Sequence, residues 1–181
     1  MTEQSEELLV GAAQDGHLDS FAALYERYYN SMVALAYSVL ADRHLSEDAA
    51  QQAFAIACRD LPKLKSKEKF VIWLAGICRN VARQMRRSRA RLVSLNGTPP
   101  DRDQNNKDNH ADAVRRAVWN LRATEREPIV LRYYNGLSYE GIAAVLGISA
   151  QAVHGRLTRA KRKIAKYLKR EGFTGGDYET P

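Results

Sequence analysis

Apolar side chains recur every three or four residues through the first half of the chain, which is the spacing of a helix face. The longest stripe consists of Phe21, Leu24, Tyr25, Tyr28, Met32, Leu35 and Val39. A second helix is predicted from Ser46, as its N-cap, to Pro62, and a third carries apolar positions from Phe70 to Met85. A shorter helix around residues 6–13 is expected to pack on these. The pattern predicts a helical bundle without strands.

Between residues 92 and 111 the periodicity stops, because Asn96-Gly97, Pro99-Pro100 and a polar run follow one another. This segment is interpreted as a flexible linker that leaves two domains uncoupled. Beyond it, helices are predicted again. Thr124 and Glu127 have the spacing of a capping box at the start of one of them.

Residues 138–160 have the pattern of a helix-turn-helix, with Ser138 and Ser149 as N-caps and Gly147 in the tight turn. Val153 and Leu157 are expected to pack the second helix on the first. The outward positions, which suit contacts with base edges and phosphates in duplex DNA, are Gln151, His154, Gly155, Arg156, Thr158, Arg159, Arg162, Lys163 and Lys166. A plain helical hairpin with a basic outer face is the alternative.

The net charge of +7 is unevenly distributed. Residues 1–60 contain 3 basic and 10 acidic side chains, a balance of −7, and the rest of the chain has a balance of +14. Two stretches, 70–100 and 154–170, are basic and contain no acidic residue. This polarity suits a protein that meets nucleic acid with one part and another partner with its acidic part, although solvated helix faces would give the same composition.

The first of these stretches combines arginines with an amide and an aromatic side chain. Arg79, Arg83, Arg86 and Arg87 follow one side of the helix, beside Asn80 and opposite Trp73, Ile77 and Val81. Such a row suits single-stranded DNA, whose backbone needs neutralising and whose bases can stack. The simpler alternatives are that Trp73 belongs to the core and that the arginines only solubilise the helix.

Other classes of protein are disfavoured. Cys58 and Cys78 form no CxxC pair and lie on apolar stripes, so both are predicted to be small core residues. The histidines lack metal-ligand spacing, and no P-loop, HExxH or GxSxG motif is present, so we expect neither a cofactor nor an enzyme. The N-terminus lacks a basic signal-peptide region and no apolar run reaches the roughly 20 residues of a membrane span, which favours the cytoplasm.

Four segments resemble the sigma-70 family of RNA polymerase sigma factors. Ser46–Phe54 resembles region 2.2, Phe70–Arg83 resembles regions 2.3 and 2.4, and Leu131–Ala143 with Leu146–Ala160 is similar to region 4. Nothing resembling region 1.1 or region 3 is found, which is the layout of the small extracytoplasmic-function group. The resemblance implies an all-α fold with region 2 in residues 1–91, a linker at 92–111, region 4 at 112–170 and a tail at 171–181.

The resemblance also implies partners and sites. Core RNA polymerase would bind the helix face of Asp48, Gln51, Gln52 and Phe54. The melted −10 strand would contact the loop lysines Lys63, Lys65 and Lys67 and the row Arg79, Asn80, Arg83, Arg86 and Arg87, while the helix-turn-helix would bind the −35 duplex. An anti-sigma factor is a further possible partner. Three positions depart from the family: Gly141 stands where an acidic residue is usual, Ala152 replaces a frequent threonine and Gly155 a frequent serine.

Three other functions remain open from the residues alone. A stand-alone helix-turn-helix regulator would need a ligand pocket or a dimer seam. A protein–protein adaptor should lack the DNA-directed arginines, and a nucleic-acid-processing enzyme should carry a catalytic constellation. Dependence of DNA recognition on polymerase distinguishes the first of these from a sigma factor.

Overall fold

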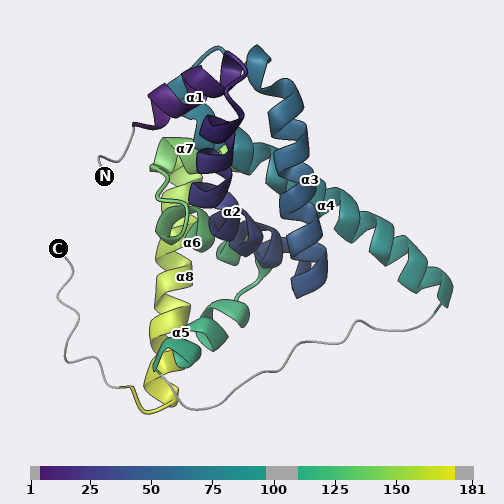
Figure 1. The fold of residues 1–181 in the computed structure, drawn as a ribbon. Helices are drawn as coiled ribbons and strands as arrows, with labels where there is room; N and C mark the ends of the chain where they lie inside the picture. The colour runs from purple at the N-terminus through teal and green to yellow at the C-terminus, as the bar shows by residue number, and fades with distance from the viewer. Residues whose placement is uncertain (1–4, 97–109, 174–181) are drawn as a thin grey trace.

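The structure, a computed structural model, describes residues 5–96 and 110–173. Within these ranges every regular element is helical, so the predicted all-α class is confirmed (Figure 1). The α-helices are α1 (Glu6–Gln14), α2 (Leu18–Leu40), α3 (Arg43–Asp60), α4 (Phe70–Asn96), α5 (His110–Trp119), α6 (Ala123–Tyr133), α7 (Tyr139–Leu146) and α8 (Ala150–Arg170). Two short 3₁₀ turns, η1 (Leu61–Lys63) and η2 (Lys67–Lys69), connect α3 to α4.

Helices α1 to α4 form one bundle around the apolar stripes that the sequence predicts. Leu24, Met32 and Leu35 of α2 are fully buried, as are Phe70 and Leu74 of α4. The long α4, about 40 Å at 1.5 Å per residue, packs with its first half only. Its second half projects beyond the bundle (Figure 1).

The helix-turn-helix is formed by α7 and α8 as predicted. The Ser138 side chain caps α7 by accepting from the backbone N–H of Gly141, and Ser149 caps α8 in the same way. Gly147 adopts φ +68° in the turn, a conformation that favours glycine. Val153 and Leu157 are buried within the shared core, which fixes the second helix against the first.

Two predicted helix starts are wrong. Helix α3 begins before Ser46, because the Asp42 side chain already accepts a hydrogen bond from the backbone N–H of Leu45, at 3.1 Å. Ser46 is buried in the first turns instead. Thr124 lies inside α6, and Glu127 forms an ion pair with another helix in place of the predicted capping box.

The two halves of the chain are not independent. Helix α6 lies against α2, α7 lies against α4, and buried residues from both halves form one continuous apolar cluster. The expectation of uncoupled domains is therefore wrong for this structure. Helix α4 also extends to Asn96, into the predicted linker; residues 97–109 lie outside the described residues, as does the tail beyond 173.

Candidate nucleic-acid interface

The predicted polymerase-binding helix, α3, presents three of its four candidate residues on one surface. Asp48, Gln51 and Gln52 are exposed, and their spacing of three and four places them on the same helix face. Phe54 is different, because only 3% of its surface is exposed. Its ring packs against Tyr25, with centroids 4.7 Å apart, so it supports the helix from inside and is not placed to contact a partner.

The basic loop between α3 and α4 borders a shallow hollow of about 380 Å³. Lys63, Lys65 and the half-buried Trp73 line it, together with Asp60 and nearby apolar side chains. Trp73 is thus available at a surface and not only to the core. Lys63 forms an ion pair with Asp60 at 2.7 Å. The third predicted lysine, Lys67, lies elsewhere, with its side chain over Gly11 of α1.

The shape of this loop depends on a residue that the sequence did not reveal. The Gln14 Nε2 atom donates to two backbone carbonyls, those of Leu61 at 3.0 Å and Leu64 at 2.8 Å. Because the donor and the acceptors are about 50 positions apart in sequence, neither periodicity nor charge pattern points to the contact. Gln14 therefore fixes the backbone from which Lys63 and Lys65 project.

The arginine row on α4 is only partly accessible. Asn80, Arg86 and Arg87 are exposed and Arg83 is half-buried, whereas the Arg79 side chain is 12% exposed. Arg79 Nε lies 2.5 Å from Glu127 Oε2, and its Nη1 donates to the carbonyl of Val145 at 3.4 Å. In this arrangement Arg79 faces the second half of the chain and not solvent.

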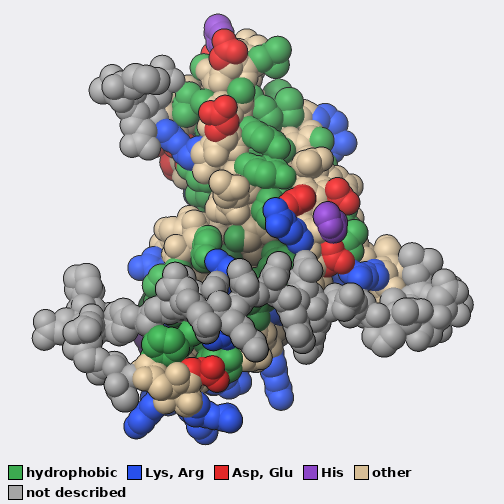
Figure 2. Space-filling model, turned by 60° about the horizontal axis from the view of Figure 1, so that its bottom comes forward, with side chains coloured by type: hydrophobic (Ala, Val, Ile, Leu, Met, Phe, Trp, Pro, Cys, Tyr) green, Lys and Arg blue, Asp and Glu red, His purple; other side chains and the backbone are tan. Residues whose placement is uncertain are grey.

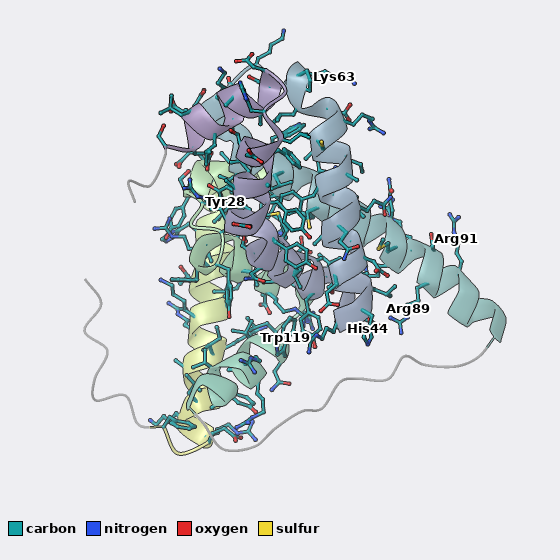
Figure 3. All side chains as sticks on the ribbon, in the orientation of Figure 1. Tyr28, His44, Lys63, Arg89, Arg91 and Trp119 are labelled. Atoms are coloured by element: carbon teal, nitrogen blue, oxygen red, sulfur yellow. The ribbon has the colours of Figure 1, made fainter. Side chains whose placement is uncertain are left out.

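The projecting half of α4 continues the basic character of the row. Arg89 and Arg91 lie along it, and Lys63 lies at the far end of the bundle (Figure 3). Arg89 pairs with Asp42 at 2.6 Å and so ties α4 to the start of α3. The pKa of Asp42 is lowered, first by the backbone N–H of Leu45 and then by this guanidinium.

The recognition helix α8 presents most of its predicted residues to solvent. Among them Gln151, His154, Arg159 and Arg162 are exposed, and Gly155, Arg156 and Thr158 are half-buried. Lys163 is held by both carboxylate oxygens of Glu125, at 2.7 and 2.8 Å, so its ammonium points to α6. This lysine lowers the pKa of Glu125.

Aromatic and basic side chains beside α8 extend this surface. The Tyr139 ring lies under the Arg132 guanidinium at 5.4 Å and against the His154 ring at 5.8 Å. Tyr133 and Tyr134 are 58% and 70% exposed. The sequence analysis missed these residues, although the adjacent Arg-Tyr-Tyr triplet before the helix-turn-helix was a signal that could have found them.

Charge and hydrophobicity are unevenly spread over the surface. Lys and Arg side chains gather at the lower edge of Figure 2, away from much of the exposed apolar surface. Among the described helices, none is both long enough and apolar enough to cross a lipid bilayer. In the same part of the chain, metal-ligating side chains nowhere form a group of three.

Comparison with known proteins identifies both halves. Residues 24–92 match the family model of sigma-70 region 2, and residues 111–164 match that of sigma-70 region 4. The RNA polymerase sigma-H factor of Pseudomonas aeruginosa is 28% identical, over 93% of this chain and 96% of that protein. The ECF RNA polymerase sigma-E factor of Escherichia coli is also 28% identical, over 91% and 95%. The ECF sigma factor BldN of Streptomyces coelicolor is 31% identical, over 88% of this chain and 64% of BldN.

Solved structures have the same fold. CnrH, in complex with the cytosolic domain of CnrY, matches 93% of this chain and 99% of its own, with 25% identity and a TM-score of 0.68. The sigma factor RpoE of Bartonella quintana, in complex with the anti-sigma factor NepR, matches 82% and 96%, with 24% identity and a TM-score of 0.73.

Proposed function

Since the chain belongs to the sigma-70 family, as a sigma factor of the extracytoplasmic-function group, we propose which of its surfaces carry out each step of promoter-specific initiation. The observation that carries the proposal is the presence, in one chain, of a capped helix-turn-helix with a polar N-terminal face and a separate arginine helix beside a Trp-lined hollow. The chain supplies recognition, and phosphodiester chemistry belongs to the polymerase.

Core RNA polymerase binds the exposed face of α3, through Asp48, Gln51 and Gln52. Long polar and acidic side chains on a rigid helix suit a hydrogen-bonded protein interface, since their backbone is already ordered. An anti-sigma protein that binds this chain would control access to that face. Such a complex, and the action of the chain in the cytoplasm, are parts of the same proposal.

The −10 element is held as a single strand. Lys63 and Lys65 offer phosphate contacts at the rim of the hollow, and the Trp73 ring in its wall offers a stacking surface for an unpaired base. Arg83, Arg86 and Arg87 continue the positive path along α4.

The −35 element is read as duplex by α8 in the major groove. Gln151, His154 and Arg159 are its exposed polar side chains nearest the capped N-terminus, the part of a recognition helix that reaches base edges. Arg162 follows one turn later and suits a phosphate contact.

Transcription from a panel of −35 variants, with permanganate footprinting of the melted region, tests this division. Losing a bidentate arginine–guanine contact costs about 1–3 kcal/mol at one base pair, so Arg159→Ala should flatten discrimination among the variants. Arg83→Ala with Arg86→Ala should instead reduce melting on all of them. The assignment fails if Arg159→Ala lowers every promoter equally, or if the double variant melts DNA normally. Tight sequence-specific binding without polymerase would favour a stand-alone regulator.

A further inference from the structure

The contact between the two halves of the chain covers one end of the arginine row. Arg79 of α4 is paired with Glu127 of α6, and both side chains are nearly buried, at 12% and 8% exposure. A buried ion pair is costly to break from one side, because the remaining charge loses its compensation. The closed arrangement therefore holds Arg79 away from any nucleic acid.

Further contacts join α2 to the second half. Arg126 Nε donates to the carbonyl of Ser38 at 3.1 Å, and its guanidinium lies over the Trp119 ring at 4.6 Å. The same ring meets Tyr37 edge-on, with centroids 4.2 Å apart, at the end of α2 (Figure 3). These contacts bridge residues on both sides of the segment 97–109, so they belong to the closed arrangement alone.

Gly141 allows α7 to lie directly on α4. The residue is buried, and a Cβ atom added to it would meet Ile72 Cδ1 at 3.2 Å and Cγ1 at 3.4 Å. The acidic residue that is usual here in the family would bring a carboxylate against Ile72 and Leu137. Burying an unpaired carboxylate is strongly unfavourable, so the usual residue is incompatible with this packing.

The closed arrangement is also incompatible with simultaneous contact to both promoter elements, an argument that rests on the proposed function. The elements at −35 and −10 are about 25 base pairs apart, or roughly 85 Å along B-DNA at roughly 3.4 Å per pair. Here the helix proposed for −10 touches the helix-turn-helix proposed for −35, since Arg79 Nη1 reaches the carbonyl of Val145 at 3.4 Å. The two halves must separate before both elements are bound.

We propose that Gly141 gives this chain a self-closed state, in which α7 covers α4 and Glu127 sequesters Arg79, and that the chain must open to engage a promoter. The state requires no second protein. It is a property of this sequence, because it depends on the position at which the chain departs from its family.

The test compares Gly141→Glu with Ala144→Glu, which adds the same charge to the exposed face of the same helix. Energy transfer is measured between a dye on the exposed Cys58 and a dye on an Arg170→Cys substitution at the end of α8, without polymerase or DNA. Gly141→Glu should shift the closed–open equilibrium by roughly 100-fold or more toward the open form, since a buried unpaired charge is that costly. Ala144→Glu should leave the transfer efficiency of the wild type unchanged. Equal efficiency in all three proteins would overturn the proposal.

A second pair of variants guards against misfolding of Gly141→Glu. Glu127→Gln keeps the shape of the side chain and removes its charge, and Glu140→Gln makes the same change at an exposed carboxylate of α7. Replacing a charge-assisted bond by a neutral one should open the molecule about tenfold for Glu127→Gln only. If Glu127→Gln remains as closed as the control, the pair does not hold the halves together and the proposal fails.

Core binding separates this proposal from the proposed function. The wild-type chain must bind core polymerase if it is a sigma factor, whatever its closed–open equilibrium. A chain that opens as expected but never binds core contradicts the function alone. A chain that binds core, but whose Gly141→Glu form is as closed as the wild type, contradicts the closure alone.

Discussion

Phe54 and Gln51 lie one turn apart on α3, and the structure assigns them opposite tasks. Phe54→Ala removes a ring that is 3% exposed and packs against both Tyr25 and Phe21, with centroids 4.7 and 6.4 Å apart. Truncating a buried phenylalanine to alanine costs about 3–5 kcal/mol in transfer and cavity terms. At about 2–4 °C per kcal/mol for a chain of this size, the melting temperature should fall by about 6–20 °C.

Gln51→Ala should leave stability within about 0.5 kcal/mol of the wild type, because the side chain is exposed. Its effect should appear in core polymerase binding instead. Thermal unfolding followed by circular dichroism gives the first quantity, and a core-binding titration well below both melting temperatures gives the second. Phe54→Leu, which retains most of the buried volume, is the matched control and should cost less than about 1.5 kcal/mol.

The reasoning is refuted by a specific pattern of results. A Phe54→Ala protein that melts within about 2 °C of the wild type but no longer binds core would place the ring at the polymerase surface. Full core binding by Gln51→Ala would not rescue the assignment of α3 either, unless Asp48 and Gln52 together carried the interface. Substituting all three exposed residues by alanine resolves that case.

Three further outcomes follow from single residues. Native protein should be alkylated once, at the exposed Cys58, because Cys78 is buried and burial raises its pKa to about 12; mass spectrometry showing two modified thiols before unfolding would contradict its placement. The pKa of Asp42 is lower in the folded state than in the unfolded chain, so its contribution is present above about pH 4 and lost as the pH falls below it. Asp42→Asn should flatten that part of the stability profile in denaturant titrations between about pH 5 and pH 3, and an unchanged slope would argue against it. Gln14→Leu removes two hydrogen bonds to loop carbonyls and should lower the free energy of unfolding by about 1–3 kcal/mol, with faster amide exchange in η1; wild-type exchange there would contradict the role of Gln14.

Local signals in the sequence predicted local structure well. Ser138, Gly147 and Ser149 act within one helical turn of themselves, so their residue types alone indicate the caps and the turn that the structure contains. Ser46 misled because a second capping residue, Asp42, lies upstream and captures the helix start. Cys58 misled because the buried line of α3 follows Phe54, Ala57 and Leu61, which leaves the i+4 neighbour Cys58 at the exposed edge.

Contacts between the two halves left no local trace. Glu127 has the spacing of a capping box, and Arg79 belongs to a run of arginines, so each has a complete local explanation. Their pairing joins positions 48 residues apart and becomes visible only once both helices are placed. Gly141 was recognisable as a departure from the family, but its purpose depends on Ile72 in another helix. Tertiary pairs of this kind override what a single helix would predict.

The position of α4 in the chain gives the molecule an order of assembly. Helix α4 ends at Asn96 of 181 residues, and the helices that cover it are all translated later. At about 5–20 residues per second, the ribosome needs roughly 4–17 s to make the remainder, whereas an N-terminal domain generally folds as soon as it is complete. The nascent chain thus carries an uncovered arginine helix for seconds, with Arg79 unpaired. Closure is the last step of its synthesis, and a polymerase that meets the nascent chain earlier finds α4 uncovered.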